Sequence, residues 1–115
     1  MSVSAEHNAV EALESGDPLT AYDLVEEQLR REPRNVRLRQ LRGLALSRSG
    51  AVERAAAEFR ALADEGNADE ETLGNLAAAY KALWLSDPDA PAGRTFRNLA
   101  FQTYRTAYEK TGGYW

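Results

Sequence analysis

The sequence of 115 residues contains no cysteine and a single histidine. The absence of cysteine excludes a disulfide scaffold, a cysteine-ligated zinc or iron–sulfur site, and thiol catalysis. The one histidine, His7, has no nucleophile or carboxylate at a spacing that would position it for catalysis. We therefore predict that the chain is not an enzyme and uses no metal and no cofactor.

Glycine-rich loops and long apolar runs are missing as well. Neither GxGxxG nor GxxxxGK[ST] occurs, so no phosphate-binding loop is expected. No apolar run approaches the roughly 18 residues of a membrane span, and the N-terminus lacks the basic-then-apolar pattern of a signal peptide. We expect a cytoplasmic location and no membrane partner. The 18 acidic and 14 basic residues give a net charge of −4, which disfavours nucleic acid as a partner.

The residues that are abundant favour helices. Twenty alanines and fourteen leucines stand against five valines and no isoleucine, and alanine and leucine are strong helix formers. Gly16, Gly50 and Gly66 mark helix ends, and Asp17, Asn35 and Asp69 are suited to cap helix starts. These signals predict six helices, at about 4–15, 18–32, 36–49, 52–65, 70–86 and 94–110, with a proline-containing loop over 87–93.

Residues of the same size class recur 34 positions apart. The pairs are Ala9 and Gly43, Val10 and Leu44, Ala12 and Leu46, Gly16 and Gly50, Ala21 and Ala55, and Val25 and Phe59. Helix–turn–helix units with this period resemble the tetratricopeptide repeat family. The resemblance predicts an all-α fold, with three helix pairs stacked as a short right-handed solenoid. The alternative is a generic antiparallel bundle of six helices.

The predicted repeat units are about 2–35, 36–69 and 70–111, within a single domain 1–115 that is part of a longer chain or assembly. Small residues are needed where the two helices of a unit pack closely. The predicted positions are Ala9, Gly43 and Ala77 in the first helices and Ala21, Ala55 and Ala100 in the second helices. In the third unit the strict period would place that residue at Asp89, but the matching pattern appears eleven residues later, at Ala100. An insertion in the third unit accounts for the shift.

A second pattern lies within residues 71–115. It consists of Glu71, Thr72, Leu73, Gly74, Tyr80, Lys81, Tyr104, Tyr108 and Tyr114. These residues resemble the tetratricopeptide-like TRAF-binding domain of apoptosis-signal kinase kinase kinases and bacterial signalling proteins. This resemblance implies a regulatory or scaffolding module of a larger signalling protein.

Charge is distributed in blocks along the chain. Residues 1–29 carry a net charge of −7, 30–60 carry +6, 61–93 carry −6 and 94–115 carry +3. Two interpretations remain open. Neighbouring blocks of opposite sign could attract one another and support stacking, or the arginine-rich block could bind an acidic protein segment.

The tetratricopeptide resemblance implies that the first helix of each pair lines a concave groove. We therefore predict a non-catalytic interaction or scaffold module that binds an acidic or extended protein segment there. The alternative is a self-association or intramolecular packing module, since eight of the ten aromatic residues lie in 80–115. The groove candidates are Arg37, Gln40, Leu44, Arg48, Asn75 and Lys81, and the candidates for a homo-oligomer interface are Tyr108, Tyr114 and Trp115.

Overall fold

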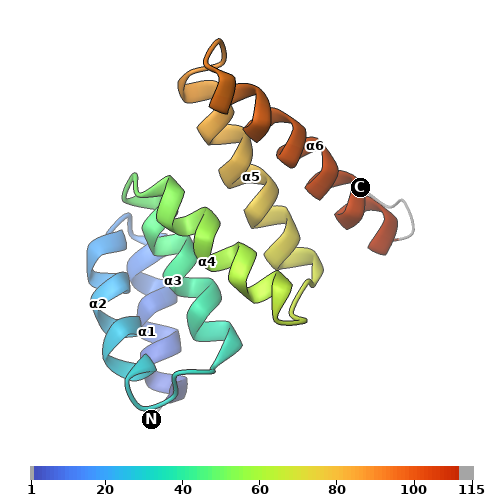
Figure 1. Ribbon diagram of the computed structural model, residues 1–115. Helices are drawn as coiled ribbons and strands as arrows, with labels where there is room; N and C mark the ends of the chain where they lie inside the picture. The colour runs from blue at the N-terminus through green and yellow to red at the C-terminus, as the bar shows by residue number, and fades with distance from the viewer. Residues whose placement is uncertain (1, 112–115) are drawn as a thin grey trace. The chain divides into compact units, whose positions relative to one another are not determined.

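A computed structural model describes residues 2–111, and these residues form six helices and no strand (Figure 1). The expected all-helical architecture is therefore confirmed for the described part of the chain. The stacking of three pairs into a right-handed solenoid, and the boundaries of the three repeat units, stay predictions. The helices are α1 (Ser2–Glu14), α2 (Pro18–Leu29), α3 (Val36–Arg48), α4 (Val52–Asp64), α5 (Glu70–Ser86) and α6 (Pro91–Lys110).

Short polar side chains begin three of the helices, as the sequence predicts. In each case the side chain accepts a hydrogen bond from the backbone amide three residues later, which satisfies one of the amides that a helix start leaves unpaired. The bonds are Thr20 N to Asp17 Oδ1 at 3.2 Å, Leu38 N to Asn35 Oδ1 at 3.0 Å, and Thr72 N to Asp69 Oδ1 at 2.8 Å.

Three helices end in the same way, at a glycine with positive φ. Gly16, Gly50 and Gly66 have φ of 80°, 93° and 99°. Residues with a Cβ atom rarely adopt this backbone conformation. The amide after each glycine donates to a carbonyl five residues back: Asp17 to Ala12, Ala51 to Leu46, and Asn67 to Leu62. In the first two endings the donor, the glycine and the acceptor are each separated from their counterpart by 34 residues. The local structure therefore repeats with the period of the sequence.

The sixth helix begins at Pro91 rather than at the predicted Arg94. The loop before it therefore spans residues 87–90 instead of the predicted 87–93. Proline suits the first position of a helix, where its fixed φ is helical and its missing amide hydrogen is not needed. Gly93, in the first turn, is buried, and a Cβ there would overlap the carbonyl oxygen of Asp87. The close return of the chain at this turn therefore requires glycine.

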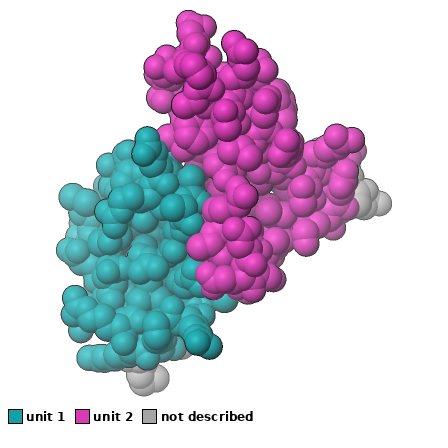
Figure 2. Space-filling view, viewed as in Figure 1, with its two compact units in different colours: residues 1–58 teal, residues 59–115 magenta. Residues whose placement is uncertain are grey.

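The chain divides into two compact units, residues 1–58 and 59–115, with the division inside α4 (Figure 2). The core of the first unit is built from small and branched residues of α1, α2 and α3, including Ala9, Ala21, Val25, Leu38 and Leu41. All six residues that the repeat pattern requires to be small are buried. They are Ala9, Gly43 and Ala77, and Ala21, Ala55 and Ala100.

In the second unit α5 and α6 pack against each other along their length. Tyr80 of α5 is only 6% exposed. Its ring stacks on Phe96 of α6, with ring centres 6.3 Å apart and planes 22° apart, and its hydroxyl accepts a hydrogen bond from Arg60 Nη1 at 2.8 Å. No helix within residues 2–111 combines the length and apolar character needed to span a membrane.

Candidate protein-interaction surface

Two arginines of α3 reach towards α1. Arg37 Nε lies 3.7 Å from Glu6 Oε1, and Arg48 Nη1 donates a hydrogen bond to the carbonyl oxygen of Leu13 at 3.3 Å. Arg37, near the start of α3, contacts Glu6 near the start of α1, and Arg48, at the end of α3, contacts Leu13 near the end of α1. The two helices therefore run side by side in the same direction, as Figure 1 also shows.

Three of the predicted groove residues share one face of α3. Arg37, Leu44 and Arg48 are separated by seven and then four positions, which places them on one side of a helix with 3.6 residues per turn. Leu44 is half-buried and packs against the core of the first unit. We call Arg37, Leu44 and Arg48 of α3, with Glu6 and Val10 of α1, the α1–α3 face.

The two arginines of this face differ in their surroundings. The side chains of Arg37 and Glu6 are 38% and 41% exposed, and an ion pair in such a position contributes at most about 1 kcal/mol to stability. Arg48 is exposed, and its one described hydrogen bond goes to a neutral carbonyl oxygen. The face therefore carries two arginines, of which Arg48 is exposed and Arg37 is half-buried.

The other three predicted groove residues are placed differently. Gln40 is buried, with 4% exposure, and its Oε1 accepts a hydrogen bond from Arg37 Nη1 at 3.4 Å, so it orients Arg37. Asn75 is half-buried and Lys81 is exposed. Both lie on α5, in the second compact unit.

Arg42 has an internal role that the sequence analysis did not identify. Its Nη1 donates to Glu26 Oε1 of α2 at 2.7 Å and its Nε donates to Glu58 Oε1 of α4 at 2.6 Å. Burial by itself would lower the pKa of Arg42, but the hydrogen bonds to Glu58 and Glu26, together with their charges, outweigh burial and raise it. Glu58 also lies 3.8 Å from Nη2 of Arg39.

Part of the basic block is thus used to hold the first unit together, which supports the first interpretation of the charge pattern. A signal for this role was present in the sequence. Glu26, Arg42 and Glu58 are separated by equal steps of sixteen residues, a spacing that can bring together successive helices of a repeat. Local spacing rules do not identify such a triplet, because they concern residues three or four positions apart.

A polar cavity of about 410 Å³ lies beside this network, between α2, α3 and α4 within the first unit. Arg54 Nη2 donates to the hydroxyl of Tyr22 at 3.1 Å, and the Arg54 guanidinium lies 5.8 Å from the centre of the Tyr22 ring. Arg42 is neutralised by its two glutamates. Both arginines that line the cavity thus have partners in its wall, Arg42 in two glutamates and Arg54 in Tyr22.

The predicted oligomer interface is partly outside the described residues. Tyr108 lies on α6 and is 51% exposed. Tyr114 and Trp115 lie beyond residue 111 and so outside the described part of the chain.

Comparison with known proteins identifies the family. Residues 17–115 match the family model described as Tetratricopeptide Repeats-Sensor, whereas no curated protein and no solved structure gives a match. The matched range runs from the cap of α2 to the end of the chain, and it confirms the tetratricopeptide resemblance. Because this range covers most of the sequence, the chain belongs to the Tetratricopeptide Repeats-Sensor family, whose repeats are in general non-catalytic protein–protein interaction modules.

Proposed function

We propose that the chain binds an acidic, extended segment of a partner protein along the α1–α3 face. The observation that carries this proposal is the arrangement of Arg37, Leu44 and Arg48 on one side of α3. The two arginines are eleven residues apart, which is about 16 Å along a helix axis. An apolar side chain lies between these two cationic ends.

This spacing describes the ligand that fits. A strand-like segment advances about 3.3 Å per residue, so carboxylates that reach both arginines stand about five residues apart. An apolar residue between them would contact Leu44. Arginine suits this task because its guanidinium binds a carboxylate through two parallel hydrogen bonds.

The Arg37–Glu6 and Arg48–Leu13 contacts are compatible with ligand binding. A carboxylate from the ligand competes with the partly exposed Glu6 for Arg37, and an ion pair at this exposure contributes little to stability. The Leu13 carbonyl holds Arg48 through one nitrogen, and a guanidinium has four further N–H donors. The Gln40 side chain accepts a hydrogen bond from Arg37 and so orients it. Asn75 and Lys81 lie on α5 and are not part of the α1–α3 face.

The resemblance of residues 71–115 to the TRAF-binding domain extends the proposal. We propose that the interaction serves as a scaffolding or regulatory contact of a larger cytoplasmic signalling protein. Binding of the acidic segment is the property that can be tested on the chain itself.

The test uses a fluorescein-labelled peptide of about 12 residues, with two glutamates five positions apart and a leucine between them. Fluorescence anisotropy measures its affinity for the wild-type chain and for R37E/R48E. We expect the variant to bind at least about tenfold more weakly, because like charges replace two attractive pairs, and we expect high salt to weaken wild-type binding.

The matched control is R30E/R31E, which makes the same change in net charge at two exposed arginines near the end of α2. The control should bind the peptide with nearly the wild-type affinity. Equal loss of affinity in both variants, or none in R37E/R48E, would show that the α1–α3 face is not the binding site.

A further inference from the structure

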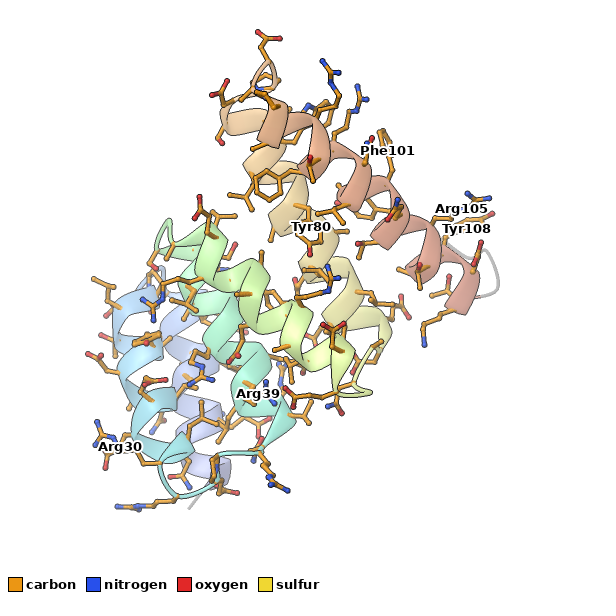
Figure 3. All side chains as sticks on the ribbon, in the orientation of Figure 1. Arg30, Arg39, Tyr80, Phe101, Arg105 and Tyr108 are labelled. Carbon is orange, nitrogen blue, oxygen red and sulfur yellow. The ribbon has the colours of Figure 1, made fainter. Side chains whose placement is uncertain are left out.

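The outer side of α6 carries a row of aromatic and cationic residues. Phe101 is 62% exposed and Tyr108 is 51% exposed, which is unusual for large apolar side chains. Figure 3 shows Phe101, Arg105 and Tyr108 projecting from the side of α6 that faces away from α5. We call this row, with steps of three or four residues along one helix face, the α6 stripe: Arg94, Arg97, Phe101, Arg105 and Tyr108.

The positive charge of the α6 stripe is largely uncompensated. Among the described residues, Arg94 and Arg97 form no ion pair. Arg105 Nε lies 3.5 Å from Glu109 Oε1, but both side chains are strongly exposed, at 82% and 69%, and such pairs are weak. Exposed aromatic rings next to arginines are typical of protein interfaces, so the stripe fits an anionic surface with an apolar floor.

The first unit of the same chain carries a surface of that kind. A groove of about 700 Å³ lies between α1 and α2, with Glu11, Glu14 and Asp17 on its walls and Ala12 and Leu24 among its apolar lining residues. Residues 1–29 contain seven acidic residues and no lysine or arginine. Hydrogen bonds from Thr20 lower the pKa of Asp17, with the larger effect from the Thr20 hydroxyl and the smaller from its backbone amide. This carboxylate is therefore charged at neutral pH.

We propose that the α6 stripe of one copy of the chain docks into the α1–α2 groove of a second copy. The charges are of opposite sign, and the groove lies in the range of about 300–1,000 Å³ that accepts a small ligand, which leaves room for an aromatic side chain such as Phe101. The contact uses none of the residues of the α1–α3 face, so it is independent of the function proposed above.

The two surfaces differ, so the contact is heterologous. Each copy offers both a stripe and a groove, and association of this kind either closes into a ring or continues into a chain of copies. The average mass should therefore rise with protein concentration and fall with added salt, because exposed charges are screened.

The test is a charge exchange followed by sedimentation velocity at protein concentrations from about 5 μM to about 1 mM, the range in which weak protein contacts populate. The stripe variant is R97E/R105E and the groove variant is E11R/E14R. Each variant alone should associate at least about tenfold more weakly than the wild type, because like charges then face each other. An equimolar mixture of the two variants should associate again, because the exchanged charges match.

Three further variants keep the test interpretable. F101S removes the exposed ring without changing charge and should also weaken association, while R30E/R31E and R37E/R48E should leave it unchanged. Circular dichroism checks that each variant stays helical. A wild-type chain that is monomeric at every concentration overturns the proposal, even if the stripe binds an acidic peptide. So does a mixture of the two charge variants that fails to associate.

Discussion

Glu26 of α2 and Arg42 of α3 are joined by a hydrogen bond of 2.7 Å between Oε1 and Nη1. The position that follows Glu26 by one period of 34 residues is Arg60, which donates to the Tyr80 hydroxyl at 2.8 Å. In both cases the second helix of a predicted pair bonds to the first helix of the next. The repeat thus keeps a polar bridge at this position, although an acid is replaced by a base.

Removal of Arg42 should destabilise the first unit. Arg42→Met leaves Glu58, whose side chain is 11% exposed, and Glu26 without their shared partner. Glu58 keeps only the longer contact with Arg39 at 3.8 Å and loses its 2.6 Å hydrogen bond. Because a partly buried carboxylate that loses its main partner is costly, we expect a loss of about 2–3 kcal/mol in the free energy of unfolding. Urea unfolding measures it. Arg30→Met is the control, since Arg30 pairs with Glu27 in an exposed position, and its loss should stay below about 1 kcal/mol.

The two parts of Tyr80 can be tested separately. Tyr80→Phe keeps the ring that stacks on Phe96 and removes the hydroxyl that accepts from Arg60. We expect a loss of about 1 kcal/mol. Tyr80→Ala also removes the buried ring and should cost about 3–5 kcal/mol. Thermal unfolding followed by circular dichroism gives both values. A Tyr80→Phe variant as stable as the wild type would contradict the role of the hydroxyl, and equal losses in the two variants would contradict the role of the ring.

The glycine endings should tolerate asparagine better than valine. Gly50 has φ of 93° and open space around its Cα, so conformation alone decides the outcome. Gly50→Asn should cost less than about 1 kcal/mol, because asparagine adopts positive φ comparatively easily, whereas Gly50→Val should cost more than about 1 kcal/mol. Chemical denaturation of the two variants compares them directly. A valine variant as stable as the asparagine variant would contradict the role of the positive φ.

The cap of α2 should make the chain sensitive to acid. Hydrogen bonds from Thr20 lower the pKa of Asp17 from its ordinary value of 3.8. A carboxylate with a lowered folded-state pKa stabilises the fold at pH values above its unfolded pKa, and that contribution is lost as the pH falls through the folded pKa. The stabilisation by Asp17 is therefore complete at neutral pH, begins to be lost below about pH 4, and is gone once the pH is below the lowered folded-state pKa.

Asp17→Asn provides the comparison, because the amide oxygen of asparagine can still cap the helix but does not titrate. Urea unfolding should show that the wild type has the larger free energy of unfolding at pH 7. The difference between the two proteins should shrink as the pH is lowered to 2. A difference that stays constant over this range would exclude a titrating cap.

The sequence could predict features that depend on neighbours within about five residues. The caps Asp17, Asn35 and Asp69 bond to amides three positions away, and the endings at Gly16 and Gly50 close over five positions. The face shared by Arg37, Leu44 and Arg48 follows from helical periodicity alone. The burial of Ala9, Ala21 and Ala100 follows from the repeat pattern, because close packing of two helices requires small residues.

Only the tertiary structure decided which charges are used internally and which remain exposed. Arg42 and Arg48 belong to the same basic block, yet Arg42 is held between Glu26 and Glu58 while Arg48 reaches the Leu13 carbonyl at an open face. Gln40 shares the helix with Arg37 but is buried beneath it. Local sequence determined the helices and their faces, because backbone hydrogen bonds and caps are short-range. Partners sixteen to thirty-five residues away became neighbours only when the helices packed, and this packing assigned each charge its role.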